Sequence, residues 1–201
     1  MEIFFVRHGM TQGNLEKRYT GRTNDSLLPQ GAELLKLAYY PLVNKIFSSP
    51  LLRCIETAEL IYPAIPIEEC DSLIETDFGI FENKNYLELQ NLPAYYAWIE
   101  GNIPPPNGES RDDFQNRCVA GFHQIIEQSL QENLKKIAIV THGGVIMAIM
   151  HGLANPSRTF YEWQVTNGDG WKVVLSPLEW HTKKHFSLIS PLHSKEEQKN
   201  A

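Results

Sequence analysis

Ile3-Phe4-Phe5-Val6-Arg7-His8-Gly9, close to the start of the chain, is the stretch from which the fold can be worked out. Its first four residues are apolar and rich in aromatic and β-branched types, which predicts a buried strand. The strand runs directly into Arg7 and His8, so a cation and an imidazole follow at the rim of a sheet. Gly9 allows a sharp turn and a close approach of the backbone to a ligand. Because open α/β sheets bind ligands beyond the carboxyl ends of their strands, we expect the functional site here.

The same arrangement occurs a second time, where Ile137-Ala138-Ile139-Val140 is followed by Thr141-His142-Gly143-Gly144. Each histidine follows an apolar strand and precedes a glycine. A single histidine at the end of a strand is often only a hydrogen-bonded residue at the rim of a sheet. Two in parallel contexts indicate one shared site at the carboxyl edge of the sheet.

Predicted strands alternate with predicted helices along the chain, which is typical of an α/β fold with a mainly parallel sheet. Beyond the two strands above, we expect strands at residues 43–48 and 65–67, and three later strands, at least one of them antiparallel, at residues 165–166, 171–175 and 184–189. Helices are expected at residues 30–40, 49–60 and 145–153, and another follows an N-cap at Ser110. Residues 71–109 have an irregular pattern, and the segment from about 83 to 109 is expected to be an insertion that caps one end.

The length and charge of the chain narrow its class. Its 201 residues are ample for one α/β domain and marginal for two, so we expect one domain over residues 1–192 and a polar tail over residues 193–201. A formal net charge of -6 without a basic stripe argues against nucleic acid or a membrane surface as a partner. No signal peptide or membrane-spanning run is visible, and the three cysteines show no Cys-x-x-Cys spacing, so we expect a cytoplasmic protein.

Cationic side chains from other segments are expected to join the two histidines. Arg53 lies near the start of the helix after the 43–48 strand, and Arg22 is a further candidate in the loop after Gly21. The planar guanidinium group of arginine matches phosphate bidentately, and helix N-termini add free N–H groups. An imidazole can also act as a nucleophile and form a phosphoenzyme. Together these residues indicate a site for a phosphate group, whose charge the arginines and the second imidazole would stabilise.

Glu75, in Leu73-Ile74-Glu75-Thr76-Asp77-Phe78-Gly79, is the candidate for the proton donor that a leaving alcohol needs. It follows the expected strand at residues 65–67 and can therefore reach the same rim. A carboxyl group close to a phosphate dianion is protonated more readily, because like charges repel each other. It can then act as a general acid and later as the base for an attacking water. On the residues alone, Glu75 also fits a solvated carboxylate in a loop.

Six motifs, taken in order along the chain, carry a family resemblance. They are Arg7-His8-Gly9 with Thr11 and Asn14, Tyr19-Thr20-Gly21 followed by Leu28-Pro29-Gln30-Gly31, Ser48-Ser49-Pro50-Leu51-Leu52-Arg53-Cys54-Ile55-Glu56-Thr57-Ala58, Glu75-Thr76-Asp77-Phe78-Gly79, Gly108-Glu109-Ser110 and Thr141-His142-Gly143-Gly144. The chain resembles the histidine phosphatase superfamily, the phosphoglycerate mutase-like proteins, over nearly its whole length.

The resemblance implies a three-layer α/β/α sandwich with a mainly parallel sheet and a small helical cap. It implies that His8 is the phosphorylated nucleophile and that Glu75 is the acid and base. Arg7, Arg53 and His142 would hold the phosphoryl group. The further substrate-binding candidates are Asn14, Thr20, Gly21, Arg22 and Gly143, of which Arg22 has no fixed role in the family. The resemblance implies neither a metal ion nor a cofactor.

The family contains both phosphatases and mutases. A mutase needs extra basic residues after the acid/base glutamate, but between Thr76 and Ser110 this chain has only Lys84, and its cap is short. Gly144 also stands where mutases typically carry asparagine. We therefore expect a metal-independent phosphomonoesterase for a small organic phosphate, with phosphoglycerate mutase-type transfer as the alternative. A phosphate-binding protein without turnover is a further alternative, although His8 and the other expected catalytic residues are intact.

Aromatic residues are frequent in the predicted cap, in particular in Tyr95-Tyr96-Ala97-Trp98 and at Tyr86. They fit either the packing of a small cap or a wall for a flat or sugar-like leaving group. With the proline turn and Asn107-Gly108-Glu109 that follow, this segment is similar to bacterial α-ribazole phosphatases, which makes α-ribazole 5′-phosphate a candidate substrate. Residues 165–175 could offer an edge strand for a homodimer.

Overall fold

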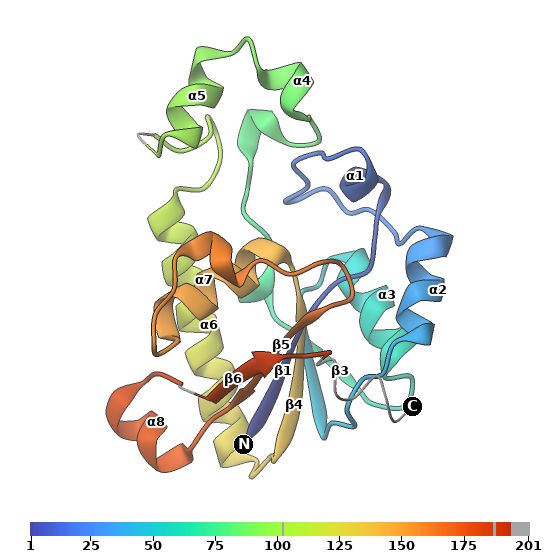
Figure 1. Cartoon of the computed structure of the whole chain (residues 1–201), viewed down its shortest axis with the longest axis vertical. Coiled ribbons are helices and arrows are strands. Elements are labelled where there is room, and N and C mark those ends of the chain that lie inside the picture. Colours follow the sequence, from blue (N-terminus) through green and yellow to red (C-terminus); the bar gives the residue numbers. More distant parts are fainter. Residues whose placement is uncertain (102, 187, 194–201) are drawn as a thin grey trace.

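The computed structural model describes residues 1–101, 103–186 and 188–193. These residues form a six-stranded sheet with helices around it (Figure 1). The strands are β1 (Glu2–Arg7), β2 (Lys45–Ser48), β3 (Ile67–Glu69), β4 (Lys136–Thr141), β5 (Gly170–Val174) and β6 (Leu188–Pro191). The predicted polar tail, residues 193–201, lies outside the described residues apart from residue 193.

Helices connect most of these strands. The α-helices are α1 (Gln12–Leu15), α2 (Pro29–Leu37), α3 (Leu52–Ile61), α4 (Tyr86–Leu89), α5 (Pro93–Ile99), α6 (Arg111–Gln131), α7 (Gly143–Leu153) and α8 (Pro177–Lys183). Three short 3₁₀ segments are η1 (Asp71–Leu73), η2 (Gly79–Phe81) and η3 (Phe160–Trp163). None of the helices in the described ranges is long and apolar enough to cross a membrane.

The order of the strands in the sheet is β3-β2-β4-β1-β5-β6. The first four of these are parallel to one another, and β5 runs antiparallel to both of its neighbours. In the β1–β4 pair, Arg7 lies opposite Thr141, so His8 and His142 leave the sheet side by side. The predicted α/β fold with a mainly parallel sheet is confirmed, and so is the shared edge of the two histidine motifs.

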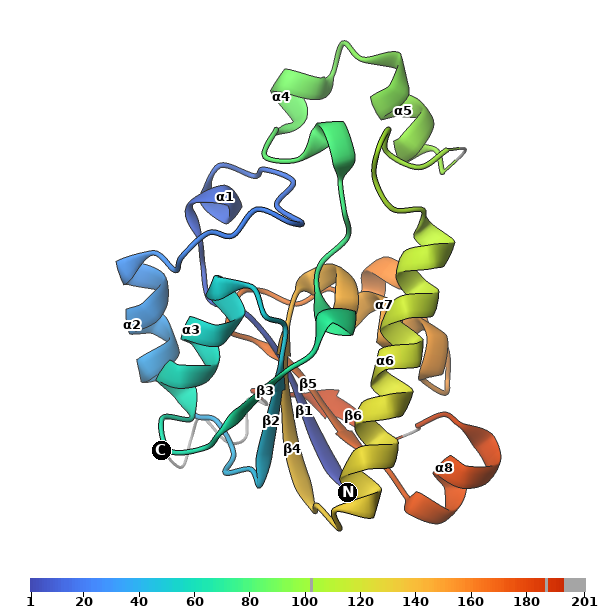
Figure 2. The same cartoon turned by 180° about the vertical axis from the view of Figure 1, so that it is seen from behind.

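The sheet is covered by helices on both faces. Successive residues of β1 point to opposite sides of the sheet, so each face carries apolar side chains. Ile3 and Phe5 pack in one hydrophobic cluster with α6 and α7, whereas Phe4 and Val6 pack in another with α3. Figures 1 and 2 show α6 and α7 on one side of the sheet and α2 and α3 on the other. Each of these buried side chains contributes roughly 1.5–3 kcal/mol to the free energy of unfolding. The expected three-layer α/β/α sandwich is confirmed.

Three expected elements are present with shifted boundaries. The helix expected at residues 30–40 is α2, which ends at Leu37, ahead of Pro41. The helix expected from residue 49 begins at Leu52, because residues 49–51 form the turn that leads into it. The strand expected at residues 65–67 is β3, which starts at Ile67 because the N–H of Ile65 still closes a turn onto the Tyr62 carbonyl.

Two of the strand predictions are wrong, one of them in part. Residues 165–166 form no strand, because the Val165 carbonyl accepts a hydrogen bond from the Arg7 guanidinium instead of pairing in the sheet. Residues 184–186 of the segment expected at 184–189 do not belong to a strand either, and Phe186 forms only an isolated bridge with Ala154. Ser176 caps the unexpected helix α8, and Lys184, with a left-handed φ of 52°, ends it. Residue 187 lies outside the described residues, and β6 begins at Leu188.

The segment expected to be irregular, residues 71–109, contains η1, η2, α4 and α5. Helices α4 and α5 stand at the end of the molecule opposite the N-terminus, above the carboxyl ends of the parallel strands (Figure 1). Phe81, Leu89 and Tyr95 form a small buried core of their own there. The helical cap that the resemblance implies is therefore present, although its helices are shorter than those of the main layers.

The edge strand proposed for dimer formation is not at an edge. β5 pairs with β1 on one side and with β6 on the other. Its backbone groups are therefore already used inside the sheet, and the edges are β3 and β6. The expectation of a homodimer loses the structural basis on which it was made.

Candidate active site

A cavity of about 740 Å³ lies at the carboxyl ends of β1 and β4, under the cap. Six of the residues predicted from the sequence line it: Arg7, His8, Asn14, Thr20, Glu75 and Gly143. Four others do not reach its wall in the described part of the chain: Gly21, Arg22, Arg53 and His142. The edge of the parallel sheet thus brings together most of the predicted site.

The imidazole of His8 is buried, with 3% of the residue exposed, and its hydrogen bonding determines its tautomer. Nδ1 lies 2.7 Å from the Gly9 carbonyl oxygen, which can only accept, so Nδ1 carries the proton. Burial lowers the pKa of His8 well below its ordinary value, and Arg53 and Arg7 lower it further. The ring is therefore neutral at neutral pH, with an unshared electron pair on Nε2. Such an imidazole is ready to act as a nucleophile.

His142 packs against His8, with 5.2 Å between the ring centroids, but it is enclosed by protein. Its Nδ1 accepts from Arg53 Nε at 3.3 Å, so Nε2 carries the proton and donates to Ser49 Oγ at 2.8 Å. Burial, and after it Arg53, lowers the pKa of His142 well below its ordinary value. Both of its ring nitrogens are bound by protein groups, and its contact with a phosphoryl group stays a prediction.

The two arginines occupy different positions. Arg7 lines the cavity, and its Nη1 donates to the Val165 carbonyl oxygen at 2.7 Å. Its Nε is buried and has no partner among the described residues, which leaves a donor for an anion. Arg53 is fully buried next to His142 and is not part of the cavity wall, so its contact with a phosphoryl group stays a prediction.

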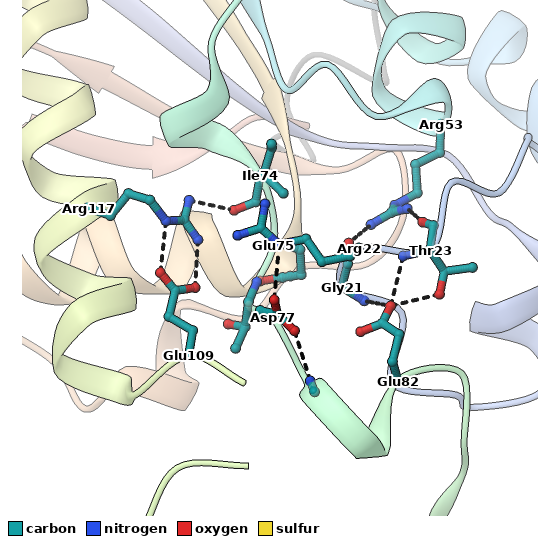
Figure 3. A network of polar contacts seen from close by, with 12 residues as sticks. Gly21, Arg22, Thr23, Arg53, Ile74, Glu75, Asp77, Glu82, Glu109 and Arg117 are labelled. Carbon is teal, nitrogen blue, oxygen red and sulfur yellow. Dashed lines mark hydrogen bonds and ion pairs between the residues drawn. The ribbon is translucent and has the colours of Figure 1, made fainter. Parts of the chain in front are cut away.

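Arg53 instead organises the loop at residues 20–23. Its Nη1 donates to the Thr23 carbonyl oxygen at 2.6 Å, and its Nη2 donates to those of Thr20 and Gly21 at 3.1 and 3.0 Å. From the other side, one carboxylate oxygen of Glu82 accepts from the N–H groups of Gly21 and Thr23, both at 2.8 Å. Figure 3 shows the loop held between this cation and this anion. Glu82 was missed because no sequence motif marks a carboxylate that binds backbone groups more than 55 positions away.

Arg22 points out of this loop. Its Nε lies 3.8 Å from Asp77 Oδ2, and both side chains are about two-fifths exposed, at 44% and 39%. Such an exposed ion pair contributes little to stability. The predicted role of Arg22 in binding a phosphate is therefore not supported by its position, and Gly21 contributes its N–H to Glu82 rather than to the cavity.

Glu75 lies at the cavity wall with both carboxylate oxygens oriented by backbone groups. Oε1 accepts from the N–H of Thr76 and Oε2 from the N–H of Gly144, each at 2.9 Å. Gly144 belongs to the first turn of α7, whose unpaired N–H groups attract negative charge. The alternative of a solvated loop carboxylate does not fit this arrangement.

The backbone that carries Glu75 is itself held by Arg117 on α6. Arg117 Nη1 donates to the carbonyl oxygens of Ser72 and Ile74 at 3.0 and 2.9 Å. Its Nε and Nη2 bind both carboxylate oxygens of Glu109 at 2.9 and 2.8 Å (Figure 3). This bidentate pair is the strong geometry for arginine and carboxylate. Sequence reasoning did not single out Arg117, which is one of several charged residues on a long helix.

Aromatic residues contribute to the wall of the cavity: Tyr19, Phe78, Trp98, Phe160 and Tyr161. Of the cap aromatics, Trp98 lines the cavity, whereas Tyr95 belongs to the cap core and Tyr96 is exposed. Both interpretations of the cap aromatics therefore hold, for different residues. The contribution of Phe160 and Tyr161 from η3 was not expected, because nothing in their sequence indicates that they reach the cavity.

A protein-family model described as the histidine phosphatase superfamily (branch 1) matches residues 3–186 of the chain. The chain belongs to this superfamily. The family resemblance seen in the sequence is thus confirmed, and the enzyme class is that of the histidine phosphatases.

Three curated relatives illustrate the range of activities in the superfamily. A broad-specificity phosphatase of Saccharomyces cerevisiae is 30% identical over 165 residues, which cover 76% of this chain and 70% of that protein. A 2,3-bisphosphoglycerate-dependent phosphoglycerate mutase of Cytophaga hutchinsonii is 30% identical, with 74% and 75% covered. An adenosylcobalamin/alpha-ribazole phosphatase of Escherichia coli is 27% identical, with 84% and 87% covered.

The fold is also found in solved structures. A putative alpha-ribazole-5′-P phosphatase from Escherichia coli superimposes with a TM-score of 0.81 and covers 97% of each chain, at 24% identity. At this identity the similarity concerns the fold alone.

Proposed function

We propose that this histidine phosphatase hydrolyses phosphate monoesters of small organic molecules, without a metal ion, through a phosphohistidine on His8. The observation that carries the proposal is that His8 and Glu75 line one cavity, with the electron pair of His8 on Nε2. Nucleophile and proton donor are thus available to the same bound phosphate.

Two displacements would complete the reaction. In the first, the electron pair of His8 Nε2 forms a bond to phosphorus while the bond from phosphorus to the ester oxygen breaks, and Glu75 donates its proton to that oxygen. In the second, water attacks the phosphohistidine, Glu75 takes a proton from the water, and the P–N bond breaks to release inorganic phosphate. Arg7 and the N–H groups at the start of α7 would stabilise charge on the phosphoryl oxygens.

The test is rapid-quench detection of a phosphoenzyme that is stable in base and labile in acid, with p-nitrophenyl phosphate as substrate and EDTA present. His8→Ala should abolish both the phosphoenzyme and turnover, and EDTA should have no effect. His181→Ala, an exposed histidine on α8, is the matched control and should behave as wild type. Turnover by His8→Ala at the wild-type rate would refute the proposal, as would inhibition by EDTA.

For the substrate, we propose a monophosphate whose leaving group is flat or sugar-like, with α-ribazole 5′-phosphate as the first candidate. The aromatic wall from Trp98 to Tyr161 supports this choice, since aromatic faces suit flat rings. The test is kcat/KM across α-ribazole 5′-phosphate, nucleoside monophosphates, sugar monophosphates and 3-phosphoglycerate. Equal values across this panel would refute the preference and leave the phosphatase proposal intact.

Phosphoglycerate mutase activity is the alternative, and two basic residues on the cavity wall favour it: Lys17, and Arg111, whose Nη2 donates to the Trp98 and Ile99 carbonyl oxygens. Arg18 also lines the cavity, but it is bound to Glu16 and Glu88. Formation of 2-phosphoglycerate from 3-phosphoglycerate faster than phosphate release would favour the mutase. Binding without any turnover would indicate a phosphate-binding protein. The homodimer and the cytoplasmic location stay predictions, and sedimentation equilibrium tests the first.

A further inference from the structure

We propose that Asn167 is a positioning residue that orients both His8 and Asn14 for phosphoryl transfer. The inference rests on the proposed role of His8 as nucleophile. Asn167 lies in the irregular segment between η3 and β5, is half-buried and lines the cavity. It is not part of either histidine motif, and about 160 positions separate it from His8 along the chain.

The side-chain amide of Asn167 donates to three acceptors that surround the predicted nucleophile. Its Nδ2 lies 3.0 Å from the His8 carbonyl oxygen, 3.3 Å from the Gly9 carbonyl oxygen and 3.0 Å from Asn14 Oδ1. All three partners are oxygen atoms that accept. Only the nitrogen end of the amide can serve them, so the orientation of this amide follows from its partners.

The contact with Asn14 determines what Asn14 presents to a substrate. Asn14 Oδ1 accepts from Asn167 Nδ2 and also from the backbone N–H of Thr11 at 3.1 Å. With its oxygen held by these donors, Asn14 has its Nδ2 group available as a donor at the cavity wall. An N–H donor is what a phosphoryl oxygen requires, whereas the opposite orientation would present an acceptor to an anion.

The contact with Gly9 bears on the nucleophile. The Gly9 carbonyl oxygen accepts from His8 Nδ1 at 2.7 Å and from Asn167, while the Gly9 N–H donates to Thr57 Oγ1 at 2.9 Å. The two peptide groups that flank Gly9 are therefore each held by hydrogen bonds. The Gly9 carbonyl keeps the proton of His8 on Nδ1 and so keeps the electron pair on Nε2. Asn167 supports the reactive tautomer through the carbonyl that defines it.

The decisive variant is Asn167→Asp, which keeps the shape of the side chain and replaces the donor by a carboxylate. The carboxylate would face three oxygen acceptors, so it would repel them rather than bind them. We expect the single-turnover rate of phosphohistidine formation to fall by roughly 100-fold in Asn167→Asp and roughly 10-fold in Asn167→Ala. KM should change by less than about threefold, because the loss concerns the orientation of reacting groups.

A second readout is the ¹⁵N spectrum of the His8 ring, which distinguishes the two neutral tautomers. We expect the Nδ1-protonated form to dominate in wild type and to lose population in Asn167→Asp.

A double-mutant cycle with Asn14→Ala tests the contact between Asn167 and Asn14. If Asn167 acts in part through Asn14, Asn167→Ala should cost less in the Asn14→Ala background than in wild type. Asn133→Asp, on the surface, is the matched control and should match wild type throughout.

The outcomes separate the inference from the function on which it rests. A wild-type protein without phosphohistidine would overturn the proposed function and the inference with it. Phosphohistidine formation in wild type together with a rate within twofold in Asn167→Asp would overturn the inference alone. A greater loss in Asn167→Ala than in Asn167→Asp would also overturn it, because filling the space would then matter more than donating. Thermal unfolding of each variant confirms that the compared proteins are folded.

Discussion

Gly144→Ala is the substitution for which the structure makes the sharpest prediction. A Cβ atom at residue 144 would lie 2.2 Å from Glu75 Oε1, whereas ordinary contacts begin at 3.4 Å. The difference between these two values is about 1.2 Å, and the carboxylate would have to move by roughly that amount. The hydrogen bond from the Gly144 N–H to Oε2 would be disturbed by the same movement.

The substitution should have a small effect on stability and a large effect on activity. The obstructing atom is the end of a flexible side chain, so the fold can absorb the methyl group. A displacement of about 1 Å in a catalytic group, by contrast, costs roughly 100-fold in rate. We expect kcat/KM for an alkyl phosphate to fall by about that factor and the free energy of unfolding to change little.

The assay compares an alkyl phosphate with p-nitrophenyl phosphate, whose leaving group needs little protonation. For p-nitrophenyl phosphate the loss should be less than about tenfold. Gly152→Ala, on the same helix, is the control, because its Cβ would meet only the ends of the Val119 and Gln115 side chains, at 3.0 and 3.4 Å. An unchanged alkyl phosphate activity in Gly144→Ala, or equal losses for both substrates, would refute the assignment of Glu75 as proton donor.

Other predictions concern the remaining parts of the site. Glu75→Gln should reduce turnover of alkyl phosphates far more than turnover of p-nitrophenyl phosphate, as measured by kcat for each; equal losses would argue against an acid role. Arg117→Met removes two bonds to carbonyl oxygens and a bidentate ion pair, so urea unfolding should show a loss of about 1–3 kcal/mol. Because burial first, and nearby guanidinium groups second, lower the pKa of both His8 and His142, the unfolded chain binds protons below pH 6.5 that the folded protein does not. Urea unfolding should therefore show stability falling by up to about 1.4 kcal/mol per histidine for each pH unit below 6.5, and constant stability down to pH 5.5 would contradict the neutral rings. Trp98→Ala should lower kcat/KM for aromatic or nucleoside phosphates more than for a simple alkyl phosphate, and an equal loss for both would assign Trp98 to packing.

The fold and the centre of the site could be predicted because their signals are local. Four apolar residues before Arg7-His8-Gly9 and another four before Thr141-His142-Gly143 predict buried strands, and parallel strands in one sheet end at a common edge. That rule alone was sufficient to bring His8 and His142 together. Glu75 required the family resemblance in addition, since a carboxylate in an irregular segment has no periodicity by which to be recognised.

The positions of Arg53, Glu82 and Asn167 follow from the tertiary structure alone. Most of their partners are backbone groups, which every residue carries, so composition and spacing give no signal for them. Arg53 looks from the sequence like a phosphate ligand, but folding surrounds it with the carbonyl groups of residues 20–23. The local pattern of apolar and polar residues thus determines at which edge of the sheet the site lies. The contacts of each side chain within the site depend on which distant backbone groups folding brings next to it.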